Sequence, residues 1–153
     1  MDNYFFDTSA LVKRYNAESG TNWVLQIYRS SSNNIIHISQ ITLVEAMATF
    51  ARRSKIKAQS SRYPKIVGRF ERDVSNRFSV FKINDAIISQ AMKLAAKYAL
   101  RGYDAVQLAS ALYAEDSLSK LNLSPLIFVS ADNELNTAAK AEGLNVENPN
   151  NYP

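Results

Sequence analysis

Short apolar segments alternate with longer segments of helical pattern along the whole chain, and this alternation restricts the possible folds most strongly. The apolar segments expected to form strands are Asn3–Asp7, Ile35–Ser39, Phe78–Ile83, Leu126–Ser130 and a short one at Leu144–Glu147. The helices expected between them are Ser9–Tyr15, Ser19–Ser30, Ile41–Lys55, Ala58–Asn76, one capped by Asn84 and running to Leu100, Asp104–Ser117, and one from Asp132 to Gly143. Strands that alternate with helices predict an α/β sandwich, in which helices flank a mainly parallel central sheet.

A chain of 153 residues fits a single domain, which we expect to span residues 1–153. The absence of cysteine excludes disulfides, thiolate metal sites and a cysteine nucleophile. No apolar run approaches the ~18 residues that a membrane-spanning helix needs. The opening residues, Met1-Asp2-Asn3, run directly into a strand-like segment and do not resemble a signal peptide. We therefore expect a cytoplasmic protein with no membrane partner.

Four carboxylates stand at the edges of apolar segments: Asp7, Glu45, Asp104 and Asp132. Asp7 and Asp132 lie at or just beyond the carboxyl ends of two expected strands. Glu45 and Asp104 lie in the first turn or so of expected helices. Because ligands bind outside the carboxyl ends of parallel strands, we expect all four to reach one crevice. A cluster of acids close to a core usually means a divalent metal.

Helix capping is the alternative explanation for some of these acids. An Asp just after a strand and just before a helix is an ordinary N-cap, and this applies to Asp132. Asp104 has a similar explanation, since it follows a helix-breaking glycine. Glu45 lies past the first turn of its helix, so capping does not explain it. Asp7 ends a strand beside two Phe residues, where a carboxylate is costly unless it is compensated.

A group of four carboxylates raises its own pKa values by mutual repulsion, and divalent cations would cancel that charge. Mg²⁺ and Mn²⁺ prefer such hard oxygen ligands. Two ions can activate a water and stabilise a leaving alkoxide in phosphodiester cleavage, and one ion is equally compatible with the sequence. Ser9 or Thr8 would bind a metal-held water or a phosphate oxygen, with capping of the first helix as the alternative.

Other catalytic classes fit this sequence poorly. The only histidine, His37, lies in an expected apolar strand and is expected to be structural, which argues against a Ser-His-Asp triad. The glycines are scattered, so neither a G-x-x-x-x-G-K-[ST] loop nor a G-x-G-x-x-G motif is present. An aspartyl-phosphate phosphatase usually carries a second acid two residues after its first, where this chain has Ser9.

The net charge of +4 is unevenly distributed, because residues 52–82 contain ten basic residues and two acids. Within them, helical spacing predicts one basic ridge, formed by Arg62, Lys65, Arg69 and Arg72. Such a ridge suits the phosphates of RNA or an acidic protein partner, and a solvated helix face is the alternative. Lys13 and Arg14, close to Asp7, are further candidates for contact with nucleic acid.

Four segments resemble the motifs of PIN-domain proteins of the VapC toxin type, in the right order along nearly the whole chain. They are Phe6–Tyr15 (FDTSALVKRY), Thr42–Ala46 (TLVEA), Arg101–Ala109 (RGYDAVQLA), and Phe128–Leu135 (FVSADNEL) followed by Ala138, Ala139 and Glu142-Gly143-Leu144. The resemblance implies a PIN-like three-layer sandwich and Mg²⁺- or Mn²⁺-dependent endoribonuclease activity. It also implies a cognate antitoxin of the VapB type and a homodimer.

Carried over by position, the resemblance implies an acidic metal site for one or two ions, with Ser9 or Thr8 as its polar helper. The acids of that site would be Asp7, Glu45, Asp104 and Asp132. One departure is Gln107, where many relatives carry His. Two alternatives stay open: a non-catalytic RNA- or protein-binding module on the same fold, and a housekeeping nuclease that does not act as a toxin.

Overall fold

The computed structural model describes residues 1–56 and 60–153, and within them a five-stranded sheet forms the centre of the molecule. Its strands are β1 (Asn3–Phe6), β2 (Ile35–Ser39), β3 (Phe78–Phe81), β4 (Leu126–Val129) and β5 (Asn145–Glu147). Their order across the sheet is β3-β2-β1-β4-β5, and every neighbouring pair is parallel. The mainly parallel sheet expected from the sequence is therefore confirmed.

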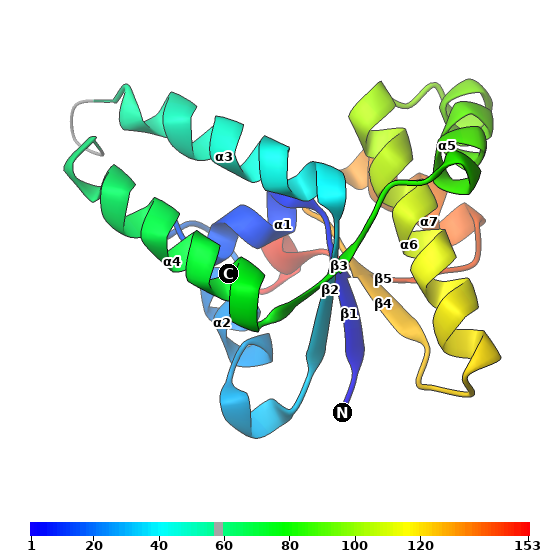
Figure 1. Cartoon of the computed structure of the whole chain (residues 1–153), viewed down its shortest axis with the longest axis horizontal. Helices are drawn as coiled ribbons and strands as arrows, with labels where there is room; N and C mark the ends of the chain where they lie inside the picture. Colours follow the sequence, from blue (N-terminus) through cyan, green and yellow to red (C-terminus); the bar gives the residue numbers. More distant parts are fainter. Residues whose placement is uncertain (57–59) are drawn as a thin grey trace.

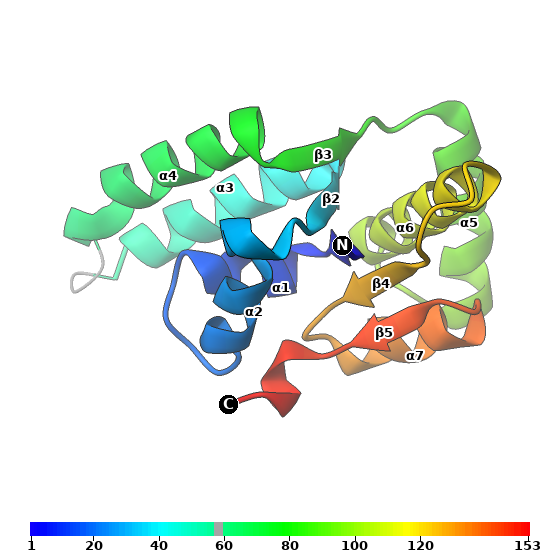
Figure 2. The same cartoon turned by 90° about the horizontal axis from the view of Figure 1, so that it is seen from below.

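Helices cover both faces of this sheet (Figures 1 and 2). One face carries α1 (Thr8–Leu11), α2 (Thr21–Ile27), α3 (Gln40–Ser54) and α4 (Tyr63–Asn76), and the other carries α5 (Asp85–Tyr98), α6 (Gly102–Lys120) and α7 (Asn133–Ala141). Short 3₁₀ helices occur at η1 (Val12–Arg14), η2 (Ser30–Ser32), η3 (Ser60–Arg62) and η4 (Pro149–Asn151). The result is the three-layer sandwich that the sequence predicted. Among the described residues, none of the helices combines the length and apolarity that crossing a membrane requires.

The alternation of side chains along the central strand divides the core in two. Phe5 packs with Phe128 and with the apolar faces of α5, α6 and α7. Phe6 points the other way and packs with Tyr28 and with the apolar residues of α1–α4. Both Phe side chains are fully buried, which stabilises the fold by roughly 2–3 kcal/mol each. Successive residues of a strand face opposite sides, so a strand that is apolar at both positions needs helices on both faces.

The largest difference from the expected elements is in the fourth helix. It was expected from Ala58, but Ala58 and Gln59 lie outside the described residues. The described chain passes through η3, and α4 starts only at Tyr63 with Pro64 in its first turn. A proline has no backbone N–H to donate and therefore suits a first turn.

The remaining differences at helix ends are small, and one of them changes the position of Asp104 within its helix. Asn84 caps α5 as expected, with its side chain accepting from the Ile87 amide at 2.9 Å. α6 begins at Gly102, two residues before the expected start, and this places Asp104 inside its first turn.

The strand order creates a crevice beside β1. From β1 the chain adds β2 and β3 on one side, and it then returns to place β4 and β5 on the other. The direction of the connections therefore reverses between β1 and β4, and the segments that follow these two strands run to opposite faces of the sheet. Asp7 follows β1 directly, and Asp132 lies between β4 and α7.

Candidate active site

The four acids predicted to converge all line one cavity of about 520 Å³, which we call the acidic cavity. Asp7 reaches it from the end of β1, Glu45 from α3, Asp104 from the first turn of α6 and Asp132 from the start of α7. Four elements that are far apart in sequence thus deliver one carboxylate each. The structure brings the acids together as the strand-end argument required.

Asp7 is held in a defined position by three hydrogen-bond donors. Its carboxylate accepts from the Ala10 amide at 2.9 Å and from the Ser130 hydroxyl at 2.7 Å. The Ser9 hydroxyl donates to the same carboxylate, 2.7 and 2.9 Å from its two oxygens. Asp7 is therefore the N-cap of α1, and the expectation that Thr8 or Ser9 caps this helix is wrong.

The charge on Asp7 is destabilised despite these donors. Only 4% of the residue is exposed, and burial raises the pKa of Asp7 to about 6. The hydrogen bonds from Ser130, Ala10 and Ser9 lower that pKa but do not outweigh the loss of hydration, and the charge of Asp104 raises it further. A nearby cation would therefore stabilise the ionised form of Asp7.

Asp104 is half-buried, and no hydrogen bond fixes its side chain within the described residues. The N-cap position of α6 belongs to Arg101, so capping does not explain Asp104. Burial, together with the charges of Asp132 and Glu45, raises the pKa of Asp104 to about 6, and Arg101 opposes this shift only in part. Asp132 differs, because its Oδ1 accepts from the Leu135 amide at 3.0 Å and caps α7. Asp132 therefore both caps α7 and lines the acidic cavity.

Glu45 is oriented by Gln107, a residue whose role the sequence did not predict. The Gln107 side-chain nitrogen lies 2.8 Å from Glu45 Oε1, 3.0 Å from Thr8 Oγ1 and 2.9 Å from Thr42 Oγ1. Thr8 also donates to Glu45 Oε1 at 3.1 Å. An amide has two hydrogens for these three oxygens, so Gln107 shares them. Two signals in the sequence pointed to Gln107: it is a polar residue one turn after Asp104 on an apolar helix, and it stands in a motif where many relatives carry His.

Ser9 connects the two strand ends that build the acidic cavity. Its hydroxyl donates to Asp7 and accepts from the Ala131 amide at 2.9 Å. Ser130, which follows β4, donates to Asp7 and accepts from the Asp132 amide at 3.0 Å. These hydroxyls therefore hold Asp7 and the backbone of Asp132 in one network. Sequence reasoning had named Ser9 but not Ser130.

The cations around the acidic cavity leave the acids unneutralised. Among residues 1–56 and 60–153, none of the four acids forms an ion pair with Lys or Arg. Lys13 is buried and donates instead to the Ser19 carbonyl at 2.8 Å and to Asn150 Oδ1 at 2.9 Å. Arg101 lines the cavity and donates to the Tyr103 hydroxyl at 3.0 Å.

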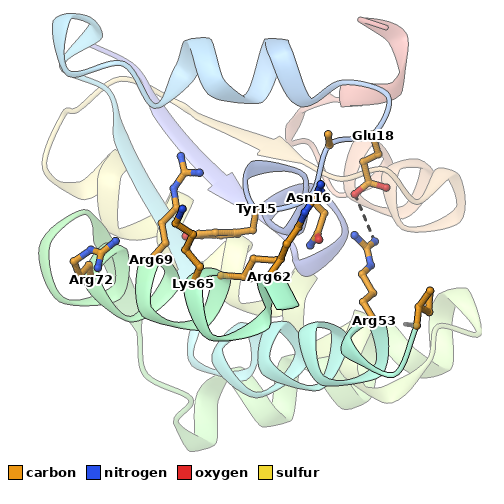
Figure 3. A pocket seen from close by; sticks show the side chains of 11 residues that line it. Tyr15, Asn16, Glu18, Arg53, Arg62, Lys65, Arg69 and Arg72 are labelled. Carbon is orange, nitrogen blue, oxygen red and sulfur yellow. Dashed lines mark ion pairs between the residues drawn. The ribbon is translucent and has the colours of Figure 1, made fainter. Parts of the chain in front are cut away.

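The predicted basic ridge lines a second cavity. Figure 3 shows Arg62, at the end of η3, in a row with Lys65, Arg69 and Arg72 of α4, and Arg53 beyond Arg62 at one end of that row. Arg14 is not among the residues that line either cavity, and its contact with nucleic acid stays a prediction. Its guanidinium is held in a buried ion pair, with Nε 2.7 Å from Asp73 Oδ2.

The donor set of the acidic cavity fits a hard divalent cation. It offers carboxylates and hydroxyls, whereas histidine and cysteine are absent from the described residues that line it. Mg²⁺ and Mn²⁺ prefer such oxygen ligands and keep several waters. Within residues 1–56 and 60–153, no group of three His, Cys, Asp or Glu side chains is arranged so that it could hold an ion by itself. An ion here would therefore use waters or small side-chain movements to complete its shell.

Asp104→Asn should stabilise the metal-free protein at neutral pH. An Asp whose pKa is raised in the folded state contributes stability below pH 4, and that contribution is lost as the pH rises through about 6. After a discount for solvent screening, the variant should be about 1 kcal/mol more stable than the native chain at pH 8. Thermal unfolding in EDTA should show a gain of a few degrees at pH 8 and a smaller one at pH 4.5.

The control for this comparison is Glu71→Gln, since Glu71 is exposed and lies in neither cavity. An Asp104→Asn melting difference that does not change with pH would contradict the electrostatic explanation.

Comparisons with known proteins agree with this architecture. The profile of the PIN domain matches residues 4–141, and no curated protein matches the chain. VapBC2 from Rickettsia felis, solved with a DNA fragment from its promoter, is similar with a TM-score of 0.62 and 18% identity, covering 95% of this chain and 98% of that one. The Mycobacterium tuberculosis toxin VapC20, which cleaves the sarcin-ricin loop, has a TM-score of 0.62 and 16% identity, covering 92% and 95%. FitAcB from Neisseria gonorrhoeae has a TM-score of 0.60 and 15% identity, covering 95% and 97%.

Proposed function

Because the chain belongs to the PIN domain family, we propose that it is a metal-dependent endoribonuclease that hydrolyses RNA phosphodiester bonds. The observation that carries the proposal is the acidic cavity, in which four carboxylates converge without an ion-paired cation among the described residues. Such an arrangement is costly for a folded protein unless a cation binds. The cost is evident at Asp7 and Asp104, since both have a pKa raised to about 6.

In this proposal, Asp7 and Asp104 bind Mg²⁺ or Mn²⁺ directly, and Glu45 and Asp132 bind directly or through water. When bound, one or two ions supply Lewis-acid activation of a water and stabilisation of the leaving oxygen. The protein holds the carboxylate oxygens of the site in fixed positions through hydrogen bonds. Ser9 and Ser130 fix Asp7, and Gln107 fixes Glu45.

Arg101 supplies the positive charge that a phosphodiester substrate needs beside these acids. It is exposed at the rim of the acidic cavity, and no carboxylate within residues 1–56 and 60–153 forms an ion pair with it. A guanidinium in this position can pair with phosphate oxygens of the bound strand. Arg101 therefore belongs to the substrate-facing side of the site.

The biological context we propose is that of a toxin paired with a VapB-type antitoxin, acting as a homodimer in the cytoplasm. Support comes from the structural neighbours, since several were solved as toxin–antitoxin complexes. At 15–18% identity these structural neighbours support the fold alone. The proposed toxin role therefore rests on the acidic cavity together with membership of the PIN domain family. Induced expression should slow growth if this role is right.

The proposal is tested by Mn²⁺ binding measured as thermal stabilisation. At a concentration about a hundred times its Kd, a bound ion contributes about 2.7 kcal/mol, which raises the melting temperature by several degrees. The rise should be absent in Asp104→Asn and retained in the exposed-surface variant Glu71→Gln. The same Mn²⁺ should be required for cleavage of a single-stranded RNA. A native protein that neither gains stability with Mn²⁺ nor cleaves RNA would identify the chain as a non-catalytic module.

A further inference from the structure

The second cavity is a basic cleft of about 680 Å³ beside the acidic cavity. Among the described residues that line it, the cations are Arg53, Arg62, Lys65, Arg69 and Arg72, and the acid is Glu18. Arg62, the last residue of η3, and the three cations of α4 follow at intervals of three, four and three residues, so they share one helix face. At 1.5 Å per residue the row is about 15 Å long, which spans several phosphates of a strand.

The four cations of η3 and α4 are not ion-paired within the described residues. Within residues 1–56 and 60–153, no carboxylate forms an ion pair with any of the four, and all four are exposed. The single acid, Glu18, is already engaged by Arg53 at 3.6 Å and by Lys13 at 3.9 Å. Like charges on one helix face repel one another, so a polyanion that binds there removes an existing electrostatic cost.

The basic cleft is continuous with the acidic cavity. Glu18 and Arg53 line both of them, and Figure 3 shows this pair at one end of the row of cations. A strand lying along α4 would therefore pass this pair and arrive at the four acids. Tyr15 and Ile66 also line the cleft, and the guanidinium of Arg69 lies over the buried ring of Tyr15, 5.9 Å from its centroid.

We propose that the basic cleft binds the phosphate backbone of the RNA strand whose scissile bond lies in the acidic cavity. The substrate class rests on the proposed nuclease function. The alternative occupant is an acidic segment of a partner protein, which would match the charge of the cleft equally well. The continuity with the acidic cavity favours RNA, because a substrate must occupy both cavities, whereas an acidic protein segment needs only the cations of the cleft.

The test compares two variants that each lose three positive charges. The cleft variant is Arg62→Gln/Lys65→Gln/Arg72→Gln, and the control is Lys82→Gln/Lys93→Gln/Lys140→Gln, whose exposed lysines line neither cavity. Binding of a fluorescein-labelled single-stranded RNA is measured in EDTA, where cleavage does not interfere. The cleft variant should bind at least about tenfold more weakly at low salt, and the slope of log K against log salt should fall by about 2 for three lost phosphate contacts.

Equal affinities of the native chain and the cleft variant would overturn the proposal, and so would an equal loss in the control. Normal RNA binding by the cleft variant together with lost binding of poly-glutamate would assign the cleft to an acidic protein instead. In a cleavage assay with Mn²⁺, the cleft variant should raise KM and leave kcat within about twofold. If the native chain binds RNA through the cleft but does not cleave it, the nuclease proposal fails, and the cleft remains an RNA-binding surface without a scissile bond beside it.

Discussion

Asp7→Asn is expected to lower the rate of RNA cleavage by at least a hundred- to a thousandfold, on the order of losing a principal electrostatic group of an active site. The amide keeps one oxygen to accept from the Ala10 amide, so α1 remains capped. It loses the negative charge and one of the two acceptor oxygens that Ser9 and Ser130 hold in place. Single-turnover cleavage of a labelled RNA with Mn²⁺ measures the effect.

The same variant separates catalysis from folding. Burial raises the pKa of Asp7 to about 6, so removing its charge should leave the metal-free melting temperature at pH 8 unchanged or higher. Full activity in this variant, with the native fold retained, would remove Asp7 from the site and the metal assignment with it.

The position of the acidic cavity was predictable because it follows from general properties of parallel sheets. Strands that alternate with helices give carboxyl ends on one edge, and Asp7 and Asp132 stand at two such ends. Helix starts face the same edge, which brings Asp104 to the cavity from α6. These inferences need only local pattern and topology.

Contacts between side chains were not predictable from the same patterns. The Thr8 and Ser9 hydroxyls suggested a cap by residue type, yet Asp7 is the cap because the strand ends one residue earlier. Gln107 contacts Glu45 across 62 positions of sequence, and a neutral amide on an apolar helix carries no sign of its partner. Nothing in the sequence pairs Arg14, a candidate for contact with nucleic acid, with a particular acid. Its partner Asp73 lies 59 residues away.

Asp73→Ala is expected to destabilise the protein by about 3–5 kcal/mol, because it leaves a buried guanidinium without its counter-charge. The Asp73 carboxylate accepts from Arg14 Nε at 2.7 Å, Arg14 Nη2 at 3.2 Å and the Tyr15 hydroxyl at 2.7 Å. Burial raises the pKa of Asp73, but the hydrogen bonds from Arg14 and Tyr15 and the charge of Arg14 outweigh it and hold the pKa below its ordinary value. Thermal unfolding should show a fall of roughly 10 °C.

The double variant Arg14→Met/Asp73→Leu distinguishes loss of a charge partner from simple loss of packing. It removes both charges and keeps apolar volume, so it should be more stable than Asp73→Ala, although the Tyr15 hydroxyl remains unpaired. A double variant as unstable as the single one would contradict the buried-charge explanation. Because Asp73 anchors the end of α4 to the segment that follows α1, Asp73→Ala should also weaken RNA binding through the basic cleft. In the double variant, where α4 keeps its packing, that affinity should return toward the native value.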